Sequence, residues 1–252
     1  MNIEWDAAKY TSDFSFVHQY GNSVIGLIDA DESSSILDLG CGNGALSKVL
    51  YDKGYIVKGI DASKELLDIA RVNYPDIEFI QADAMDFSLQ EPVDIVFSNA
   101  VFHWIDKERQ QDMLKCVYNV LKENGQFVFE FGGYGNTQLI HKTLEEIFSE
   151  YKYTYKMPCY FPTISEYALL LENAGFSVRY AVLFDRMTEL KGENGLKDWI
   201  NMFVKTPFTV IENEEEKNII IDKVVDRLKG ILYRDGKWYA DYVRLRMKAI
   251  KL

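Results

Sequence analysis

Three glycines at alternate positions, Gly40, Gly42 and Gly44, form a stretch suited to holding a ligand. A short apolar run ending in Asp38 precedes them, and an amphipathic segment, 45–53, begins directly after. This pattern indicates a buried strand, a tight turn and a helix, because glycine lets the backbone take positive φ and approach a ligand closely. The unpaired N–H groups at the helix start favour a polar ligand there. Glycine-rich turns without a ligand are also common, so the motif alone leaves both interpretations open.

Acidic or small residues stand where the next predicted strands end. The strand predicted over 55–60 ends in Asp61, about 20 residues after the first glycine, where dinucleotide-type sites place a carboxylate on both ribose hydroxyls. The carboxyl ends of parallel strands meet at one edge of a sheet, so these residues could contact one ligand lying across that edge. After the strands predicted over 77–80 and 93–97, the corresponding residues are Asp83 and Ala84, and Ser98, Asn99 and Ala100.

These positions together resemble the class I S-adenosylmethionine-dependent methyltransferase family. The spacing differs from the NAD-binding fingerprint, in which the last glycine falls one position later. The resemblance implies a methyltransferase that takes S-adenosylmethionine as its cofactor and forms S-adenosylhomocysteine. The matching motifs are Asp38-x-Gly40-x-Gly42-x-Gly44, Asp61, Asp83-Ala84 and Ser98-Asn99-Ala100.

The resemblance also implies how these residues contact the cofactor. Asp38 and the glycine turn, with Cys41 inside it, would line the methionine and ribose part. Asp61, followed by Ala62, would bind the ribose diol. The remaining contacts are implied at the next two strand ends: the Asp83 carboxylate on the adenine amine, the Ala84 N–H on a ring nitrogen, and the carbonyls around Asn99 and Ala100 on the ammonium group.

The composition is that of an ordinary globular protein, with 48% hydrophobic and 27% charged residues in a chain of 252. The formal net charge of −11 argues against a nucleic-acid substrate. The three cysteines, Cys41, Cys116 and Cys159, have no metal-like spacing, so we predict no metal site and a reducing, cytoplasmic location. We expect no signal peptide, no transmembrane helix and no membrane partner. We expect a monomer or a weak homodimer.

Strand and helix patterns alternate along the chain, which predicts an α/β fold: a doubly wound, mainly parallel, seven-stranded Rossmann-like sheet with helices on both faces. Ser63 and Asp106 are candidate helix N-caps. A sixth strand is predicted over 176–184 and the last over 238–251. The helical, acidic segment between them predicts one domain over 1–252 with a helical lid, 188–230, inserted before the last strand.

The N-terminal segment is rich in aromatic residues, among them Tyr10, Phe14 and Phe16. They could cover the edge of the core, or one of them could fold over the cofactor. We include Tyr10 and Phe16 among the candidate cofactor-binding residues and leave both interpretations open.

The second half of the chain carries a finer resemblance, to the trans-aconitate methyltransferase group. It implies a small-molecule acceptor, and most directly a carboxylate oxygen of a small organic acid. In that group an arginine often follows the N-terminal aromatic segment and can meet the cofactor carboxylate, whereas this chain has His18-Gln19-Tyr20-Gly21. Recognition of that carboxylate is therefore left open. The matching residues are Asn99 to Trp104, Phe161-Pro162, Gly175-Phe176, Asp185-Arg186, Thr188, Leu190, Trp199, Asp235 to Trp238, and Asp241-Tyr242-x-Arg244.

Methyl transfer from a sulfonium produces a neutral leaving group, so catalysis depends on holding the nucleophile dry and aligned. A carboxylate acceptor needs no base, whereas a phenol or enol does, and His103 is the candidate base. His103 could instead form a loop hydrogen bond, and Trp104 beside it could line the pocket or simply pack. His18 and His141 are interpreted as surface or packing residues. Three arginines are candidate anion ligands or ordinary ion-pair residues: Arg186, Arg234 and Arg244.

Other functions remain open from the sequence. The acceptor could be an oxygen, nitrogen or carbon of another small metabolite. A non-catalytic regulator that binds S-adenosylmethionine would carry the same cofactor motifs, and a methyl-release assay would distinguish it. A nucleic-acid or protein methyltransferase is disfavoured, because an Asn-Pro-Pro-Tyr-type tetrad is absent from 98–104.

Overall fold

Strand β1 (Ser35–Leu39) lies inside the sheet, and four of its five residues are buried, as expected for a strand covered on both faces. The computed structural model describes residues 16–252, with side chains from Tyr20 on. Along the sheet the strand order is β3-β2-β1-β4-β5-β8-β6. The other strands are β2 (Ile56–Asp61), β3 (Glu78–Gln81), β4 (Val93–Asn99), β5 (Leu121–Gly132), β6 (Phe176–Leu190), β7 (Tyr233–Arg234) and β8 (Lys237–Lys251).

The first five strands along the chain are parallel, whereas β8 pairs antiparallel with both β5 and β6. The predicted mainly parallel, seven-stranded sheet is therefore confirmed, with the two-residue strand β7 added beside β8. Strand β6 continues to Leu190, past its predicted end at Phe184, because β8 pairs with it over that whole length.

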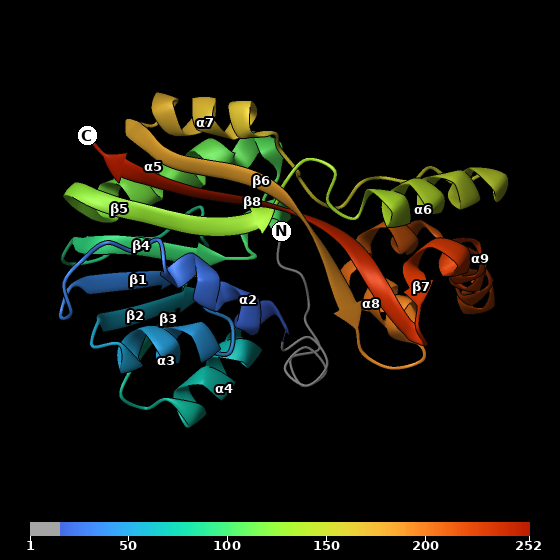
Figure 1. Ribbon diagram of the computed structural model, residues 1–252, viewed down its shortest axis with the longest axis horizontal. Coiled ribbons are helices and arrows are strands. Elements are labelled where there is room, and N and C mark those ends of the chain that lie inside the picture. The colour runs from blue at the N-terminus through green and yellow to red at the C-terminus, as the bar shows by residue number, and fades with distance from the viewer. Residues whose placement is uncertain (1–15) are drawn as a thin grey trace.

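Helices cover both faces of the sheet (Figure 1). On one face α2, α3 and α4 pack through Val24, Leu50 and Leu67; on the other α5 and α7 pack through Val117 and Tyr167. The helices are α2 (Phe16–Ile25), α3 (Ala45–Asp52), α4 (Lys64–Asn73), α5 (Gln110–Val120), α6 (Gln138–Glu150), α7 (Ile164–Asn173), α8 (Gly195–Phe203) and α9 (Glu214–Leu232), with short 3-10 turns η1 (Phe102–Trp104), η2 (Lys107–Arg109) and η3 (Thr206–Val210).

One predicted N-cap is confirmed and the other is wrong. The Ser63 hydroxyl accepts a hydrogen bond from the Leu66 N–H at the start of α4. The side chain of Asp106 makes no capping hydrogen bond, because the turn η2 separates it from α5. Instead, buried Gln110 at the start of α5 donates from Nε2 to the carbonyls of Phe102 and Ile105.

A second hydrophobic core lies at the end of the sheet, where β6 and β8 extend beyond the other strands (Figure 1). We call α6, α8, η3 and α9 the helical cluster. The predicted insertion 188–230 contains α8 and η3 and most of α9, but α6 comes earlier in the chain and also joins this core. Leu144 of α6, Trp199 of α8 and Leu228 of α9 are buried together. Within residues 16–252, no helix is both long and apolar enough to cross a membrane.

Candidate functional site

A cavity of about 460 Å³ lies between the carboxyl edge of the sheet and the helical cluster. This volume is typical of sites for cofactors and small molecules. One end is lined by residues at and just after the carboxyl ends of β1 to β4, and the other by residues of β5, β6 and β8 together with α6 and α8. The strand ends that the sequence singled out therefore face one continuous space.

Asp61, at the end of β2, lines this cavity and also supports the glycine turn. Its Oδ2 accepts the Gly42 N–H at 2.9 Å, and its Oδ1 accepts the Ser63 N–H at 2.8 Å. Burial raises the pKa of Asp61, and these backbone hydrogen bonds oppose the rise. The carboxylate thus joins the turn to the start of α4 while presenting an edge to the cavity.

Two of the glycines are required by backbone conformation and by close neighbours. Gly40 has φ 77°, and a Cβ there would lie 2.2 Å from Cγ2 of Val101. Gly44 has φ 79°, and a Cβ there would lie 2.8 Å from Cζ of Phe79. Among the three glycines of residues 40–44, Gly40 alone lines the cavity, so the motif shapes the turn more than it contacts the space in front of it.

The structure places Asp38 and Cys41 behind the wall of the cavity, together with Gly42 and Gly44. Asp38 is 2% exposed, and its Oδ2 accepts the Ser47 hydroxyl of α3 at 2.6 Å. The expected direct contact of these residues with a ligand is therefore not seen in the lining, because the Asp38 side chain points toward α3. Burial raises the pKa of the Cys41 thiol.

We predict that Asp38 makes the stability of the ligand-free protein depend on pH. Burial raises the pKa of Asp38 to about 7 from 3.8, so its contribution is present at low pH and is lost as the pH rises through 7. The free energy of unfolding should fall by about 2 kcal/mol from this group between pH 5 and 7. Urea unfolding of wild type and Asp38→Asn at both pH values tests this, since the free energy of unfolding of the variant should lack this decrease between pH 5 and 7. An equal decrease in the two proteins would contradict the prediction.

The other predicted cofactor residues lie along the cavity. Ala62, Asp83, Ala84, Asn99 and Ala100 all line it. The Asp83 Oδ1 accepts the Met85 N–H at 2.9 Å, which fixes the turn after β3. Phe16 begins α2 but its side chain lies outside the described part, and Tyr10 lies outside the described residues altogether.

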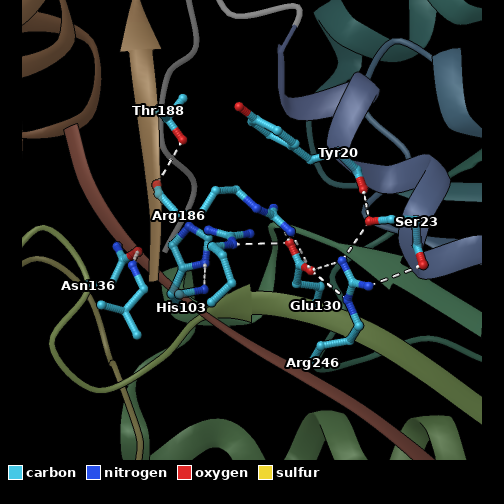
Figure 2. Close-up of polar contacts among 11 residues, drawn as sticks. Tyr20, Ser23, His103, Glu130, Asn136, Arg186, Thr188 and Arg246 are labelled. Atoms are coloured by element: carbon cyan, nitrogen blue, oxygen red, sulfur yellow. Dashed lines mark hydrogen bonds and ion pairs between the residues drawn. The ribbon is translucent and has the colours of Figure 1, made fainter. Parts of the chain in front are cut away.

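A buried charged cluster lies at the wall of the cavity, and Figure 2 shows its polar contacts. The Glu130 carboxylate, on β5, accepts from Arg186 on β6 (Nη1 to Oε1 2.6 Å, Nη2 to Oε2 3.1 Å). It also accepts from Arg246 on β8 (Nε to Oε2 2.7 Å) and from Arg244 (Nε to Oε1 3.3 Å). The Glu130 side chain is fully buried and the arginine side chains are at most 13% exposed.

Three guanidinium groups share one carboxylate, so the cluster carries two formal positive charges in excess. Burial alone would raise the pKa of Glu130, but the charges of Arg244, Arg186 and Arg246 hold it below its ordinary value. Arg244 is 8% exposed and contacts Glu130 through Nε; within the described residues its terminal nitrogens have no hydrogen-bond partner. Because Arg244 also lines the cavity, those donors can meet an anion there.

Two neutral histidines line the same part of the cavity. Burial, with the nearby charge of Arg244, lowers the pKa of His103 well below its ordinary value. The Nδ1 of His103 accepts the Gly132 N–H at 3.4 Å, so its proton resides on Nε2. His141 was predicted to be a surface or packing residue, but it is buried at the cavity wall, with Nδ1 2.6 Å from the Tyr155 hydroxyl. Burial lowers the pKa of His141 to about 4.

Aromatic residues complete the end of the cavity that lies beside the helical cluster. Trp104 stacks near Phe203 of α8, and the Trp199 Nε1 donates to the Tyr242 hydroxyl at 2.6 Å. Sequence reasoning missed Glu130, although a single acid inside the apolar run 127–131 was a usable signal. It also missed His141. Of the three candidate arginines, Arg186 and Arg244 line the cavity, while Arg234 is exposed on β7 and donates to the Ile231 carbonyl.

Comparisons with known proteins agree with this geometry. Residues 36–125 match the family model described as a methyltransferase domain. An uncharacterized methyltransferase of Schizosaccharomyces pombe is 31% identical over 261 residues, covering 98% of this chain and 98% of the relative. A trans-aconitate 2-methyltransferase of an Enterobacter species is 24% identical over 218 residues, covering 85% of this chain and 84% of the relative.

The fold is also that of solved methyltransferase structures. Magnesium protoporphyrin IX methyltransferase from Synechocystis, crystallised with S-adenosylhomocysteine, matches with a TM-score of 0.58 at 16% identity, covering 93% of this chain and 83% of that one. The sequence motifs, the sheet order and the full-length relative all lead to one assignment. The chain belongs to the class I S-adenosylmethionine-dependent methyltransferase family, in the group that includes the trans-aconitate methyltransferases.

Proposed function

We propose that this enzyme transfers the methyl group of S-adenosylmethionine to a carboxylate oxygen of a small organic acid. The observation that carries the proposal is the buried Arg244 guanidinium, whose terminal donors face a cavity also lined by neutral His103. Glu130 is already occupied by three arginines, so it does not repel an incoming anion. Within the described residues, the acceptor end of the cavity thus offers donors and aromatic surfaces to an acid.

The cofactor end fits S-adenosylmethionine. Asp61 presents a carboxylate where a ribose diol can donate, and Asp83 and Ala84 lie on the neighbouring strand end for an adenine ring. Gly40 lines the cavity at the turn, where its positive φ and the packed Val101 side chain leave no room for a Cβ. When bound, the cofactor supplies a methyl group on a positively charged sulfur, which is already activated for displacement.

The residues of this chain then need only position the acceptor. A carboxylate is a competent nucleophile without a base, and its alignment about 3 Å from the methyl can supply roughly 7–11 kcal/mol of the barrier. In this proposal Arg244 and the Nε2–H of His103 hold the acid, while Trp199, Phe203 and His141 of the helical cluster roof it and exclude water. The Enterobacter relative is named for a small organic acid, which supports the same acceptor class.

His103→Asn is predicted to keep most of the activity toward a carboxylic acid. The asparagine amide can replace the hydrogen bond to the Gly132 N–H, and no proton has to be removed from the substrate. We expect kcat to fall by no more than about tenfold in steady-state assays. A loss of several hundredfold would instead identify His103 as a general base and favour a phenol or enol acceptor.

The test of the proposal is a panel of carboxylic acids, phenols and amines incubated with a methyl-labelled donor. We expect label to be transferred to carboxylic acids, in a form released by mild alkali as expected for a methyl ester. Alkali-stable transfer to amines or phenols would favour another acceptor class. Binding of the cofactor without transfer to any panel member would favour the non-catalytic regulator.

A further inference from the structure

Arg186 lies at the part of the cavity nearest α2, where its guanidinium is within cation–π distance of two aromatic rings. Its Cζ is 4.4 Å from the ring centroid of Tyr20 and 5.0 Å from that of Phe184. Figure 2 shows the Arg186 side chain extending from β6 toward Glu130, with Tyr20 beside it. The two hydrogen bonds to Glu130, together with these ring contacts, fix the position of the guanidinium, so its remaining N–H groups have defined directions.

Arg186 keeps donor capacity after pairing with Glu130. A guanidinium has five N–H groups in one plane, and Glu130 takes one from each terminal nitrogen. Within residues 16–252, no other acceptor contacts Arg186. Arg186 lines the cavity, whereas Arg246 of the same cluster does not and is instead bonded to the carbonyl and hydroxyl of Ser23.

The position of this cluster relates it to the cofactor end of the site. Glu130 pairs directly with Asn99 of the neighbouring strand β4, and its backbone carbonyl accepts the Ala100 N–H at 2.7 Å. Arg186 is therefore anchored one strand away from the turn at 99–100. The amino-acid part of S-adenosylmethionine carries an ammonium and a carboxylate, and burying the carboxylate is costly unless it is hydrogen-bonded or paired with a cation.

We propose that Arg186 binds the carboxylate of the cofactor. Tyr20 lines the cavity and its ring contacts Arg186, while the sequence around it, His18-Gln19-Tyr20-Gly21, contains no arginine. In this proposal the positive charge for the cofactor carboxylate comes from Arg186 on β6, and Arg244 is left to bind the acceptor. This inference rests on the cofactor and not on the identity of the acceptor.

Calorimetric binding of two ligands tests the proposal without turnover. S-adenosylhomocysteine carries the carboxylate, and its decarboxylated analogue, S-adenosyl-3-thiopropylamine, differs by that group alone. Arg186→Gln should weaken binding of S-adenosylhomocysteine by roughly 30–100-fold and binding of the analogue by less than about 3-fold. Arg186→Lys should give an intermediate loss, since it keeps the charge without the planar fork.

Arg246→Gln is the matched control, because it removes another arginine from Glu130 outside the cavity lining. It should leave the ratio of the two affinities unchanged, even if it lowers the melting temperature. Equal losses for both ligands in Arg186→Gln, or an unchanged affinity for S-adenosylhomocysteine, would overturn the proposal. The proposal would also be overturned if Arg246→Gln changed the ratio of the two ligand affinities as much as Arg186→Gln does. A failure to methylate any carboxylic acid would overturn the proposed acceptor and leave these binding results unaffected.

Discussion

Replacing Asp61 with alanine is expected to weaken binding of S-adenosylhomocysteine by roughly 300-fold and to remove most of the ligand-induced rise in melting temperature. Two contributions are lost together. The ribose diol loses its carboxylate acceptor, and the N–H groups of Gly42 and Ser63 lose the partner that fixes the glycine turn against α4. Calorimetry and thermal unfolding with and without ligand measure both effects.

Two further variants separate these contributions. Asp61→Asn keeps the volume and one acceptor oxygen, so it should lose less affinity than the alanine variant. Ser63→Ala removes the α4 cap while leaving the carboxylate, and its ligand-induced shift should remain close to that of wild type. An undiminished shift in Asp61→Ala would show that the ribose does not lie at the end of β2.

Arg244→Gln is expected to lower kcat/KM for the acceptor acid by about a thousandfold, equivalent to roughly 4 kcal/mol. The variant removes a buried cation whose terminal donors face the acceptor, while Arg186 and Arg246 still neutralise Glu130. Folding should therefore survive, and affinity for S-adenosylhomocysteine should change by less than about 3-fold.

Arg234→Gln provides the control for Arg244→Gln, since it makes the same chemical change on exposed β7, outside the cavity. Its kinetics should match those of wild type. Retention of activity within tenfold in Arg244→Gln would place the acceptor carboxylate elsewhere in the cavity.

The meeting of the first strand ends at one cavity was predictable because its signals are local. Asp61 and Asn99 end short apolar strands and Asp83 closely follows another, and parallel strands bring such ends to one edge. Asp38 shows the limit of that reasoning: residues alternate between the two faces of a strand, and its carboxylate turns to Ser47 instead of the cavity.

The acceptor end could not be predicted in the same way. Glu130 meets Arg246 across 116 residues of sequence, through a β5–β8 register that no local pattern specifies. Likewise, no local pattern distinguishes His141 from other helix residues. It lines the cavity because α6 packs with α8 and α9 in the second core. The predicted insertion 188–230 contains α8 and most of α9. It could not indicate that α6, which comes earlier in the chain, joins the same core.

The long strands β6 and β8 join the helical cluster to the rest of the sheet. Pairing of β8 with β5 ends at Arg244 opposite Gly132. Beyond it β6 and β8 form a two-stranded ribbon from Arg186 opposite Tyr242 to Glu189 opposite Tyr239, after which β7 pairs with β8 at Trp238. Narrow ribbons twist more readily than wide sheets. Any movement of the helical cluster relative to the parallel strands would therefore twist this ribbon. Arg186 and Tyr242 line the cavity where the ribbon begins, so a ligand bound to both residues would restrain that movement.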